Sequence, residues 1–382
     1  MVHFLLPFTP FEPIGGVRTA FDYVMRLNEL AGQQIADILA DSPYVKSWLP
    51  TEYQQVKVLP TSTPILTTDT LLIPEVIPLA AKDYAHVMRK FLVVLNWKFL
   101  EEKLNWKELK NLGYTGILTN SNYSLQWLKK NNVKLPIWHI PQFINSATFK
   151  TAQKFGQRPK NSILVMSRKN SQHLPGLISF LRNFSHTLTV MNNIAPEKMA
   201  DQYANNQVFI NLGYPEGFCR PAAEAMASKC LVIGFTGGGG LDFMRDGATA
   251  LIAEDGNERQ LLEKLNLFLQ MTGKEKLQIV ENGHRLIISQ YSMFEQAKAL
   301  SKIFSRELGE LFTLAKLKAH YHVRRDQAHP LTKITLQSTQ TVEGLQYRYF
   351  LDHQKYQELI DSKFFRFWQL YSNVKHSFSL KK

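Results

Sequence analysis

Short apolar runs alternate with amphipathic stretches along most of this 382-residue chain. The run "HFLLPF" near the N-terminus predicts a buried strand, and "GGVRTAFDYVMRLNELAG" after it has apolar residues at helical spacing. The same order recurs in "YTGILTNSNYSLQWLKKNN" and again from "NSILVMSRKN" to "ATALIAEDG". Strands that alternate with helices favour parallel sheets covered by helices on both faces, so the sequence predicts an α/β fold.

The length of the chain favours two domains, because a single hydrophobic core seldom serves so many residues. The segment "PIWHIPQFINSATFK" is punctuated by prolines and turn residues, and a second series of strands and helices follows it. We therefore expect one domain at residues 1–150 and another at 151–300. Residues 301–382 are expected to supply return helices and a basic extension.

The formal net charge of +13 indicates an anionic partner, such as a phosphorylated ligand, nucleic acid or acidic lipid. No zinc-finger pattern, RNP motif or dense Lys/Arg block is present in the sequence, so nucleic acid is not the expected partner. No apolar stretch approaches the length of about 20 residues that a transmembrane helix needs. The N-terminus lacks the basic region and cleavage site of a signal peptide. These features predict a cytoplasmic protein.

The two cysteines, Cys219 and Cys230, have no His or Cys near them at zinc spacing. We expect both to be reduced and to pack as small apolar side chains.

The stretch "EGFCRPAAEAMASKC" contains two glutamates, Glu216 and Glu224, on either side of a predicted helix start. Pro221 suits the first helical turn, where its missing N–H costs nothing. One face of this helix is expected to be buried, and it consists of Ala223, Met226, Ala227 and Cys230. Glu224 should then lie near the helix start and Glu216 in the loop before it, both at the carboxyl edge of a parallel sheet.

Open α/β sheets bind ligands at that edge, and a helix N-terminus there favours a phosphate. A carboxylate that accepts hydrogen bonds from two hydroxyls can hold a ribose or hexose diol. The two-glutamate element therefore fits a nucleotide sugar. The alternative is a surface ion pair between Arg220 and Glu224, with Glu216 merely exposed. The spacing alone leaves both interpretations open.

The segment "EGFCRPAAEAMA" resembles the E-x7-E signature of retaining GT-B glycosyltransferases, specifically glycosyltransferase family 4. The matching residues are Glu216, Gly217, Phe218, Pro221, Glu224, Ala225, Met226 and Ala227. The chain departs from the pattern at Cys219 and Arg220. Downstream, "FTGGGGLDFMRDGATALIAEDG" resembles the Gly-Gly-x-x-Glu and Asp-Gly-x-x-Gly segment of the family, with Asp242 in place of Glu and Ala250 in place of Gly. The resemblance covers the second domain well and the first only in its organisation.

This resemblance implies a GT-B fold, in which two Rossmann-like domains face a central cleft and a C-terminal helical extension follows. It implies a retaining transferase that moves a hexose from a nucleotide diphosphate sugar to a hydroxyl. By resemblance, Glu224 would bind the ribose hydroxyls, and Glu216 the hexose hydroxyls beside the turn formed by Gly217, Phe218 and Cys219. The first domain would bind the acceptor.

Cations are expected to neutralise the diphosphate, because the chain has no Asp-x-Asp pair of the kind that holds a metal in GT-A enzymes. We therefore expect no metal and no cofactor, with the nucleotide sugar as co-substrate. Arg168 matches the diphosphate-binding arginine of the family. His173 stands where the partner lysine is usual, so Lys169 and Arg220 are candidates to replace it.

Two glycine-rich segments are further candidates. Gly15 and Gly16 lie between the first strand and helix, where they either approach the ligand or shape a tight turn. Gly238 and Gly239, in the four-glycine run after Thr236, let backbone amides approach a sugar or phosphate; a merely flexible loop is the alternative.

In the first domain, Asn96 stands where many family members have a histidine, and it is the third candidate catalytic residue with Glu216 and Arg168. Asn cannot shuttle a proton. His139 is expected to be a linker or core residue. Asn120 and Ser121 follow another strand, where they either face the ligand or cap a helix. The acceptor, a glycan, lipid-linked or small molecule, is not identified.

The C-terminal "FFRFWQLYSNVKHSFSLKK" combines aromatic and basic residues. It predicts either an interfacial helix on an anionic membrane, which would suit a lipid-linked acceptor and a peripheral location at the inner membrane face, or a helix packed back on the first domain. His320, His322 and His329 are not expected to bind metal.

Two other functions fit the departures at His173, Asp242 and Asn96. One is a non-catalytic nucleotide-sugar-binding protein, and the other is a GT-B sugar-nucleotide epimerase or phosphorylase.

Overall fold

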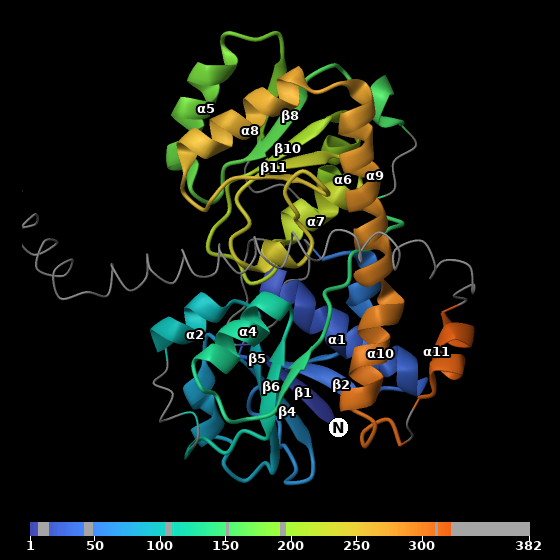
Figure 1. The fold of residues 1–382 in the computed structure, drawn as a ribbon. Coiled ribbons are helices and arrows are strands. Elements are labelled where there is room, and N and C mark those ends of the chain that lie inside the picture. Colours follow the sequence, from blue (N-terminus) through green and yellow to red (C-terminus); the bar gives the residue numbers. More distant parts are fainter. Residues whose placement is uncertain are drawn as a thin grey trace, which may run out of the picture. The chain divides into compact units, whose positions relative to one another are not determined.

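Two parallel sheets flanked by helices make up the computed structural model, which describes residues 1–6, 15–41, 49–103, 109, 111–149, 153–191, 196–309 and 312–321 (Figure 1). Within these residues the first sheet has seven strands in the order β3-β2-β1-β4-β5-β6-β7, and the second has five in the order β12-β11-β10-β8-β9. All neighbouring strands in both sheets run parallel. The predicted α/β fold with two Rossmann-like domains is confirmed.

The strands of the first sheet are β1 (Val2–Leu6), β2 (Ala36–Ala40), β3 (Val58–Pro60), β4 (Thr70–Pro74), β5 (Arg89–Val94), β6 (Gly116–Thr119) and β7 (Ile137–His139). Those of the second are β8 (Ser162–Met166), β9 (Thr187–Met191), β10 (Val208–Asn211), β11 (Leu231–Gly234) and β12 (Leu251–Ile252). The predicted boundary near residue 150 falls between β7 and β8, at a position outside the described residues.

The helices are α1 (Gly15–Ala31), α2 (Trp97–Lys103), α4 (Asn122–Lys130), α5 (Leu174–Leu181), α6 (Pro196–Asn205), α7 (Arg220–Ala227), α8 (Glu258–Gln270), α9 (Gly273–Gln290), α10 (Met293–Ile303) and α11 (Leu314–His320). Side-chain oxygens cap several of them by accepting hydrogen bonds from N–H groups of the first helical turn, which have no partner within the helix. Thr272 and Glu275 form a capping box at the start of α9, and Ser292 caps α10.

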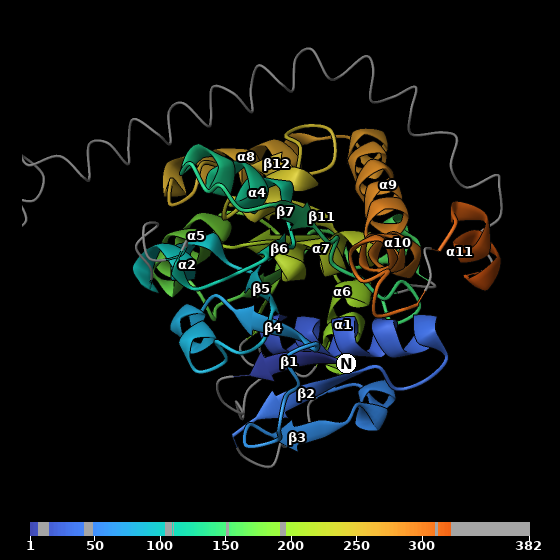
Figure 2. The ribbon, with the colours of Figure 1, turned by 90° about the horizontal axis from the view of Figure 1, so that it is seen from below.

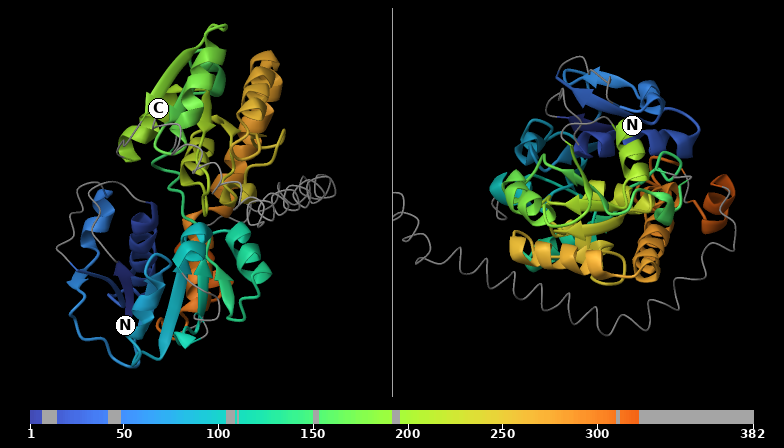
Figure 3. Two further views of the ribbon diagram at one scale, coloured as in Figure 1. Left: turned by 90° about the vertical axis from the view of Figure 1, so that its left-hand side faces the viewer. Right: turned by 90° about the horizontal axis from the view of Figure 1, so that it is seen from above.

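Each sheet is buried on both faces, which is why its strands are continuous apolar runs rather than alternating ones. In the first sheet, α1 and α10 cover one face, and α2 and α4 cover the other. In the second, α5 and α8 cover one face, whereas α6 and α7 cover the other (Figure 3). The carboxyl ends of the strands, where loops and helix starts gather, are therefore the parts of each sheet left to bind a ligand.

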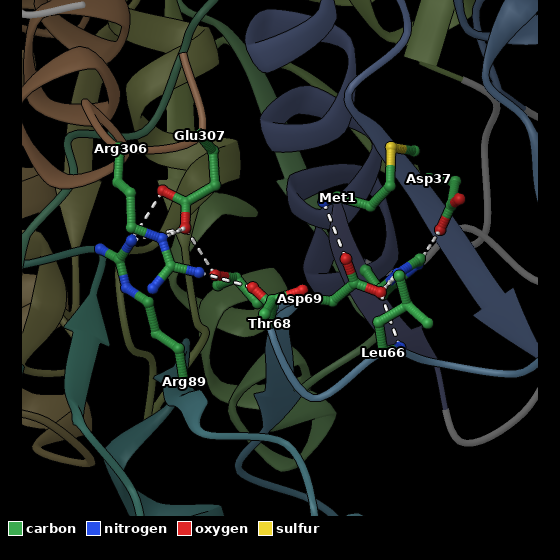
Figure 4. Close-up of polar contacts among 10 residues, drawn as sticks. Met1, Asp37, Leu66, Thr68, Asp69, Arg89, Arg306 and Glu307 are labelled. Atoms are coloured by element: carbon green, nitrogen blue, oxygen red, sulfur yellow. Dashed lines mark hydrogen bonds and ion pairs between the residues drawn. The ribbon is translucent and has the colours of Figure 1, made fainter. Parts of the chain in front are cut away.

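The C-terminal helices pass from one domain to the other. Helix α9 packs against α7 in the second domain, and α10 packs against α1 in the first (Figure 2). Glu307, just beyond α10, accepts hydrogen bonds from Arg89 Nη1 at 2.5 and 2.7 Å and from Thr70 Oγ1 at 2.6 Å, which anchors this segment to β4 and β5 (Figure 4). The chain thus returns to the first domain in α10, which begins before the residues 301–382 that were expected to supply the return helices.

The aromatic and basic C-terminal segment, with His322 and His329, lies outside the described residues, so its predicted membrane role stays a prediction. His320 is described, and its Nε2 lies 3.4 Å from Glu29 Oε1. Within the described ranges, no helix has the length and apolar character to cross a membrane.

A buried histidine lies at the amino end of the first sheet, near the cluster in Figure 4. His3 Nδ1 is 2.7 Å from Asp37 Oδ1, its register partner on β2, and Nε2 is 3.4 Å from Asp69 Oδ2. Burial opposes protonation of the imidazole, but the two carboxylates outweigh it and raise the pKa of His3 above its ordinary value.

His3→Gln should therefore cost more free energy of unfolding at pH 5.5 than at pH 8.5. A raised pKa means that the protonated imidazole stabilises the folded state fully below its unfolded pKa of about 6.5, and that this stabilisation is lost as the pH rises through the folded value. Asp69 stays ionised across this range because its pKa is lowered. Urea unfolding of wild type and variant at both pH values measures the difference, and equal losses would contradict the assignment.

Candidate active site

The two-glutamate element forms the loop and helix that the sequence predicts. The chain leaves β10 at Asn211, passes Glu216 and enters α7 at Arg220, with Pro221 in the first turn. The residues expected on the inner face of α7 are buried, namely Ala223, Met226, Ala227 and Cys230. Glu224 lies in this helix near its N-terminus with only 7% of its surface exposed.

Cys219, directly before α7, has a left-handed backbone (φ 68°) at a position where the family pattern has glycine. Its Sγ accepts a hydrogen bond from Asn211 Nδ2 at 3.0 Å. Both cysteines are free and buried, as expected. Burial raises the pKa of both thiols, that of Cys230 to about 11, so neither is a reactive thiolate near neutral pH.

Glu216 lies against the four-glycine loop. Its N–H donates to the carbonyl of Gly237 at 2.7 Å, and its carbonyl accepts from the N–H of Gly239 at 3.0 Å. A Cβ on Gly239 would lie 2.1 Å from the carbonyl oxygen of Gly217, so only glycine fits there. The loop therefore packs closely against Glu216 and Gly217, and its part in ligand binding stays a prediction.

A half-buried carboxylate holds this loop in place. Asp255 accepts hydrogen bonds from the N–H groups of Thr236 and Gly237, both at 3.0 Å. Burial raises the pKa of Asp255 to about 6, although the two N–H groups oppose the rise. Asp255 therefore fixes the backbone at Thr236 and Gly237, directly before Gly238 and Gly239.

The loop after β8 brings Lys169 to Glu216. Lys169 Nζ lies 2.7 Å from Glu216 Oε1, and Arg168 precedes it in the same loop. Asn170 Nδ2 donates to the carbonyls of Leu212 and Tyr214, both at 2.8 Å, which ties this loop to the one that carries Glu216.

His173 is buried in a hydrogen-bonded chain. Its Nδ1 lies 3.1 Å from Glu258 Oε2, and its Nε2 lies 3.1 Å from the hydroxyl of Tyr214. The ring also makes an edge-on contact with Phe235. Because both ring nitrogens already have partners, His173 is poorly placed to serve as the second cation for a diphosphate.

The first domain reaches the site at Asn96. A Cβ on Gly217 would lie 1.7 Å from the Leu95 carbonyl oxygen and 2.9 Å from Asn96 Cα, so the two backbones are in direct contact. The Asn96 N–H donates to Glu75 Oε1 at 2.8 Å. Glu75 is buried at the end of β4, and burial raises its pKa to about 7 against the opposing effect of backbone N–H groups. The structure thus brings Asn96 beside the turn at Glu216 and Gly217.

Asp242 joins the domains at a second point. Its carboxylate accepts hydrogen bonds from the N–H groups of Asn122 (2.6 Å) and Tyr123 (3.2 Å), at the start of α4 in the first domain. Burial raises the pKa of Asp242 to about 6. Ser121 also caps α4, through the N–H of Ser124, which supports the capping interpretation of that residue. Asp242, which stands where the family pattern has Glu, therefore links the second domain to the start of α4 in the first.

Four charged residues meet between α1 and α7, and we call Arg18, Asp22, Arg220 and Glu224 the interdomain charge cluster. Arg18 Nη1 lies 3.6 Å from Glu224 Oε1, and Arg220 Nη2 lies 3.2 Å from Asp22 Oδ2. Arg220 Nη1 is 3.8 Å from the same Glu224 oxygen. Burial raises the pKa of Glu224, and the two arginines oppose that rise. The pairing of Arg220 with Glu224 that the alternative interpretation expected is present, but it is largely buried rather than on the surface.

Arg220 is held further by the interdomain segment. It donates to Gln142 Oε1 at 2.7 Å and to the carbonyl of Phe143 at 3.1 Å. Gly15 and Gly16 form the first two positions of α1, one turn before Arg18. A Cβ on Gly15 would meet nothing within 4 Å, so packing alone does not require glycine there.

Arg18, Asp22, Glu75 and Asp255 were not predicted as site residues. A signal for the first two was present, because they are charged residues four positions apart in a predicted amphipathic helix, and they are buried together with Arg26. Among the described residues, no group of three or more His, Cys, Asp or Glu side chains is arranged to hold a metal ion.

Comparisons with known proteins identify the fold. The chain resembles the solved structures of sucrose-phosphate synthase from Thermosynechococcus elongatus (TM-score 0.62, 13% identity, covering 81% of this chain and 99% of that one) and Anabaena HepE with UDP and glucose (0.60, 12%, 80% and 99%). A glycosyltransferase from Rickettsia africae is also similar (0.54, 14%, 80% and 98%). At identities of 12–14% this structural similarity is evidence for the fold alone, and the fold is GT-B.

The family model described as "Glycosyl transferases group 1" matches residues 178–286, which include α7 and both glutamates. A comparison with curated proteins finds no match to this chain.

Gly217→Ala should destabilise the protein, because its methyl group would lie 1.7 Å from the Leu95 carbonyl oxygen and force the two domains apart locally. Overpacking of this kind costs about 1–3 kcal/mol. Gly156→Ala is the control, since a Cβ there meets nothing within 4 Å. Thermal unfolding of both variants measures the effect. Equal midpoints for the two would show that the contact between Gly217 and Leu95 does not form.

Proposed function

We propose that this protein is a glycosyltransferase that moves a hexose from a nucleoside diphosphate sugar to a hydroxyl acceptor, with retention at the anomeric carbon. The observation that carries the proposal is the pair Glu216 and Glu224, which lie before and within α7 in the segment that matches the glycosyltransferase family model. HepE, which has a similar fold, has been solved with UDP and glucose, so UDP-glucose is the first sugar donor to test.

In this proposal Glu224 accepts hydrogen bonds from the ribose hydroxyls, and Glu216 accepts them from the hexose. The diphosphate lies between them at the N-terminus of α7, where the helix dipole favours an anion. Arg168, in the loop after β8, contributes positive charge to the same edge. Side-chain cations of this kind neutralise the leaving diphosphate in place of a metal.

The reaction would break the bond between the anomeric carbon and the diphosphate oxygen. The acceptor oxygen bonds to that carbon on the same face, and its proton passes to the departing diphosphate. This course requires no protein nucleophile. Asn96 and the amides of the four-glycine loop would position the sugar. Closure of the two domains would exclude water from the reacting groups.

The acceptor is proposed to be a glycan, a lipid-linked sugar or a small molecule bound on the side of the first domain. The positive net charge of +13 suits a phosphorylated acceptor or an anionic membrane surface. A peripheral membrane role would rest on the C-terminal basic segment.

Glu224→Ala should weaken UDP-glucose binding about tenfold or more, because hydrogen bonds to a charged group contribute about 1.5–3 kcal/mol. The matched control is Glu263→Ala, which removes a carboxylate that is 57% exposed on α8. Isothermal titration measures both affinities. An unchanged affinity in the Glu224 variant would contradict the assignment of the ribose site.

Arg168→Ala should lower the rate of transfer about 10²–10³-fold, as loss of one transition-state contact does, with little change in the thermal midpoint. The measurement is release of UDP in the presence of candidate acceptors. Conversion of the sugar nucleotide without an acceptor would indicate an epimerase instead. Binding without any turnover would indicate a non-catalytic binding protein.

A further inference from the structure

The cations at the proposed sugar-donor site are unequally available. Lys169 is paired with Glu216 at 2.7 Å. Arg220 donates to Asp22, Gln142 and the carbonyl of Phe143 at 2.7–3.2 Å, so three acceptors fix its guanidinium. A diphosphate needs more positive charge than Arg168 alone supplies.

Arg18 is the remaining cation of the interdomain charge cluster, and it comes from the first domain. It lies in the first turn of α1 and extends to Glu224 of the second domain. Its side chain is only 7% exposed. Burial of a guanidinium costs several kcal/mol unless good partners compensate, so a buried arginine at a candidate ligand site requires explanation.

Glu224, Asp22 and a hydrogen bond with Tyr53 compensate for the burial of Arg18, and together they raise its pKa. The contact with Glu224 is nevertheless long. The 3.6 Å between Arg18 Nη1 and Glu224 Oε1 is longer than a well-formed hydrogen bond. Its Nε is buried and has no hydrogen-bond partner among the residues that the structure describes. By contrast, Asp22 accepts from both Arg220 and the hydroxyl of Tyr53. Arg220 has three hydrogen bonds of 2.7–3.2 Å, whereas Arg18 has its hydrogen bond with Tyr53 and the longer contact with Glu224. Arg18 is therefore held by fewer hydrogen bonds than Arg220.

We propose that Arg18 is a ligand of the donor diphosphate, contributed by the first domain. The proposal rests on the proposed function. Without a sugar donor, Arg18 neutralises Glu224. When the ribose hydroxyls bind Glu224, the guanidinium of Arg18 transfers to the diphosphate, while Asp22 and Gln142 keep Arg220 in place. In this exchange Glu224 replaces the guanidinium with hydrogen bonds from the ribose hydroxyls, and Arg18 gains the diphosphate, so each buried charged group keeps a polar partner.

The exchange predicts an effect that depends on the phosphates of the ligand. The test first selects the nucleoside diphosphate that wild type binds best among UDP, GDP, ADP and dTDP. The affinity for this diphosphate is then compared with the affinity for the corresponding nucleoside. Arg18→Ala should weaken binding of the diphosphate at least tenfold and leave binding of the nucleoside unchanged or tighter, because Glu224 is freed. Arg18→Lys should restore part of the loss. Arg259→Ala removes an equal charge from a side chain that is 89% exposed and should change neither affinity.

Three results would overturn the proposal. If Arg18→Ala bound both ligands more tightly, Arg18 would only compete with ligands for Glu224 and would not bind the diphosphate. Weaker binding of both, with a lower thermal midpoint, would make it only a structural residue. Unchanged binding of the diphosphate would remove it from the site. Failure of wild type to bind any of the four diphosphates would instead contradict the proposed function itself.

Discussion

The packing of charged side chains between α1 and α7 is the interaction on which the candidate site depends. Two arginines and two carboxylates are taken out of water together, so their charges balance at Arg18 with Glu224 and at Arg220 with Asp22. Removing one of them would disturb the balance of charge within a buried cluster, which is costly. The cluster therefore joins the two domains at the same place where the proposed nucleotide sugar must bind, and domain closure and ligand binding become linked.

Backbone contacts surround this cluster and explain why the neighbouring loops are rich in glycine. Gly217 lies directly against the carbonyl of Leu95, and Gly239 lies directly against Gly217. Two half-buried carboxylates, Asp242 and Asp255, accept hydrogen bonds from N–H groups of the adjoining backbone. The two domains can approach closely because glycines leave room for the neighbouring backbone and aspartates bind its N–H groups. These glycines and aspartates all lie in loops at the carboxyl ends of the strands.

Local patterns predicted much of this structure, whereas contacts between distant segments could not be predicted. The small-residue face of α7 and Pro221 at its start are local features, and both formed as expected. Strand β7 was missed because Ile137–His139 is short and lies between prolines; its pairing with β6 defines it. The partners of Arg18 and Asp242 lie more than a hundred residues away, so their roles depend on how the domains pack. The position of His173 near the site could be predicted from the family pattern. Its hydrogen bonds to Glu258 and Tyr214 could not, because these partners lie far along the chain.

The central claim is that a sugar nucleotide binds at Glu224 in exchange for Arg18. A crystal structure of the protein with its bound nucleoside diphosphate sugar tests this most directly. The account predicts ribose hydroxyls within hydrogen-bond distance of the Glu224 carboxylate, and the Arg18 guanidinium on the diphosphate. A structure in which the nucleotide lies away from α7 while Arg18 and Glu224 stay paired would contradict it.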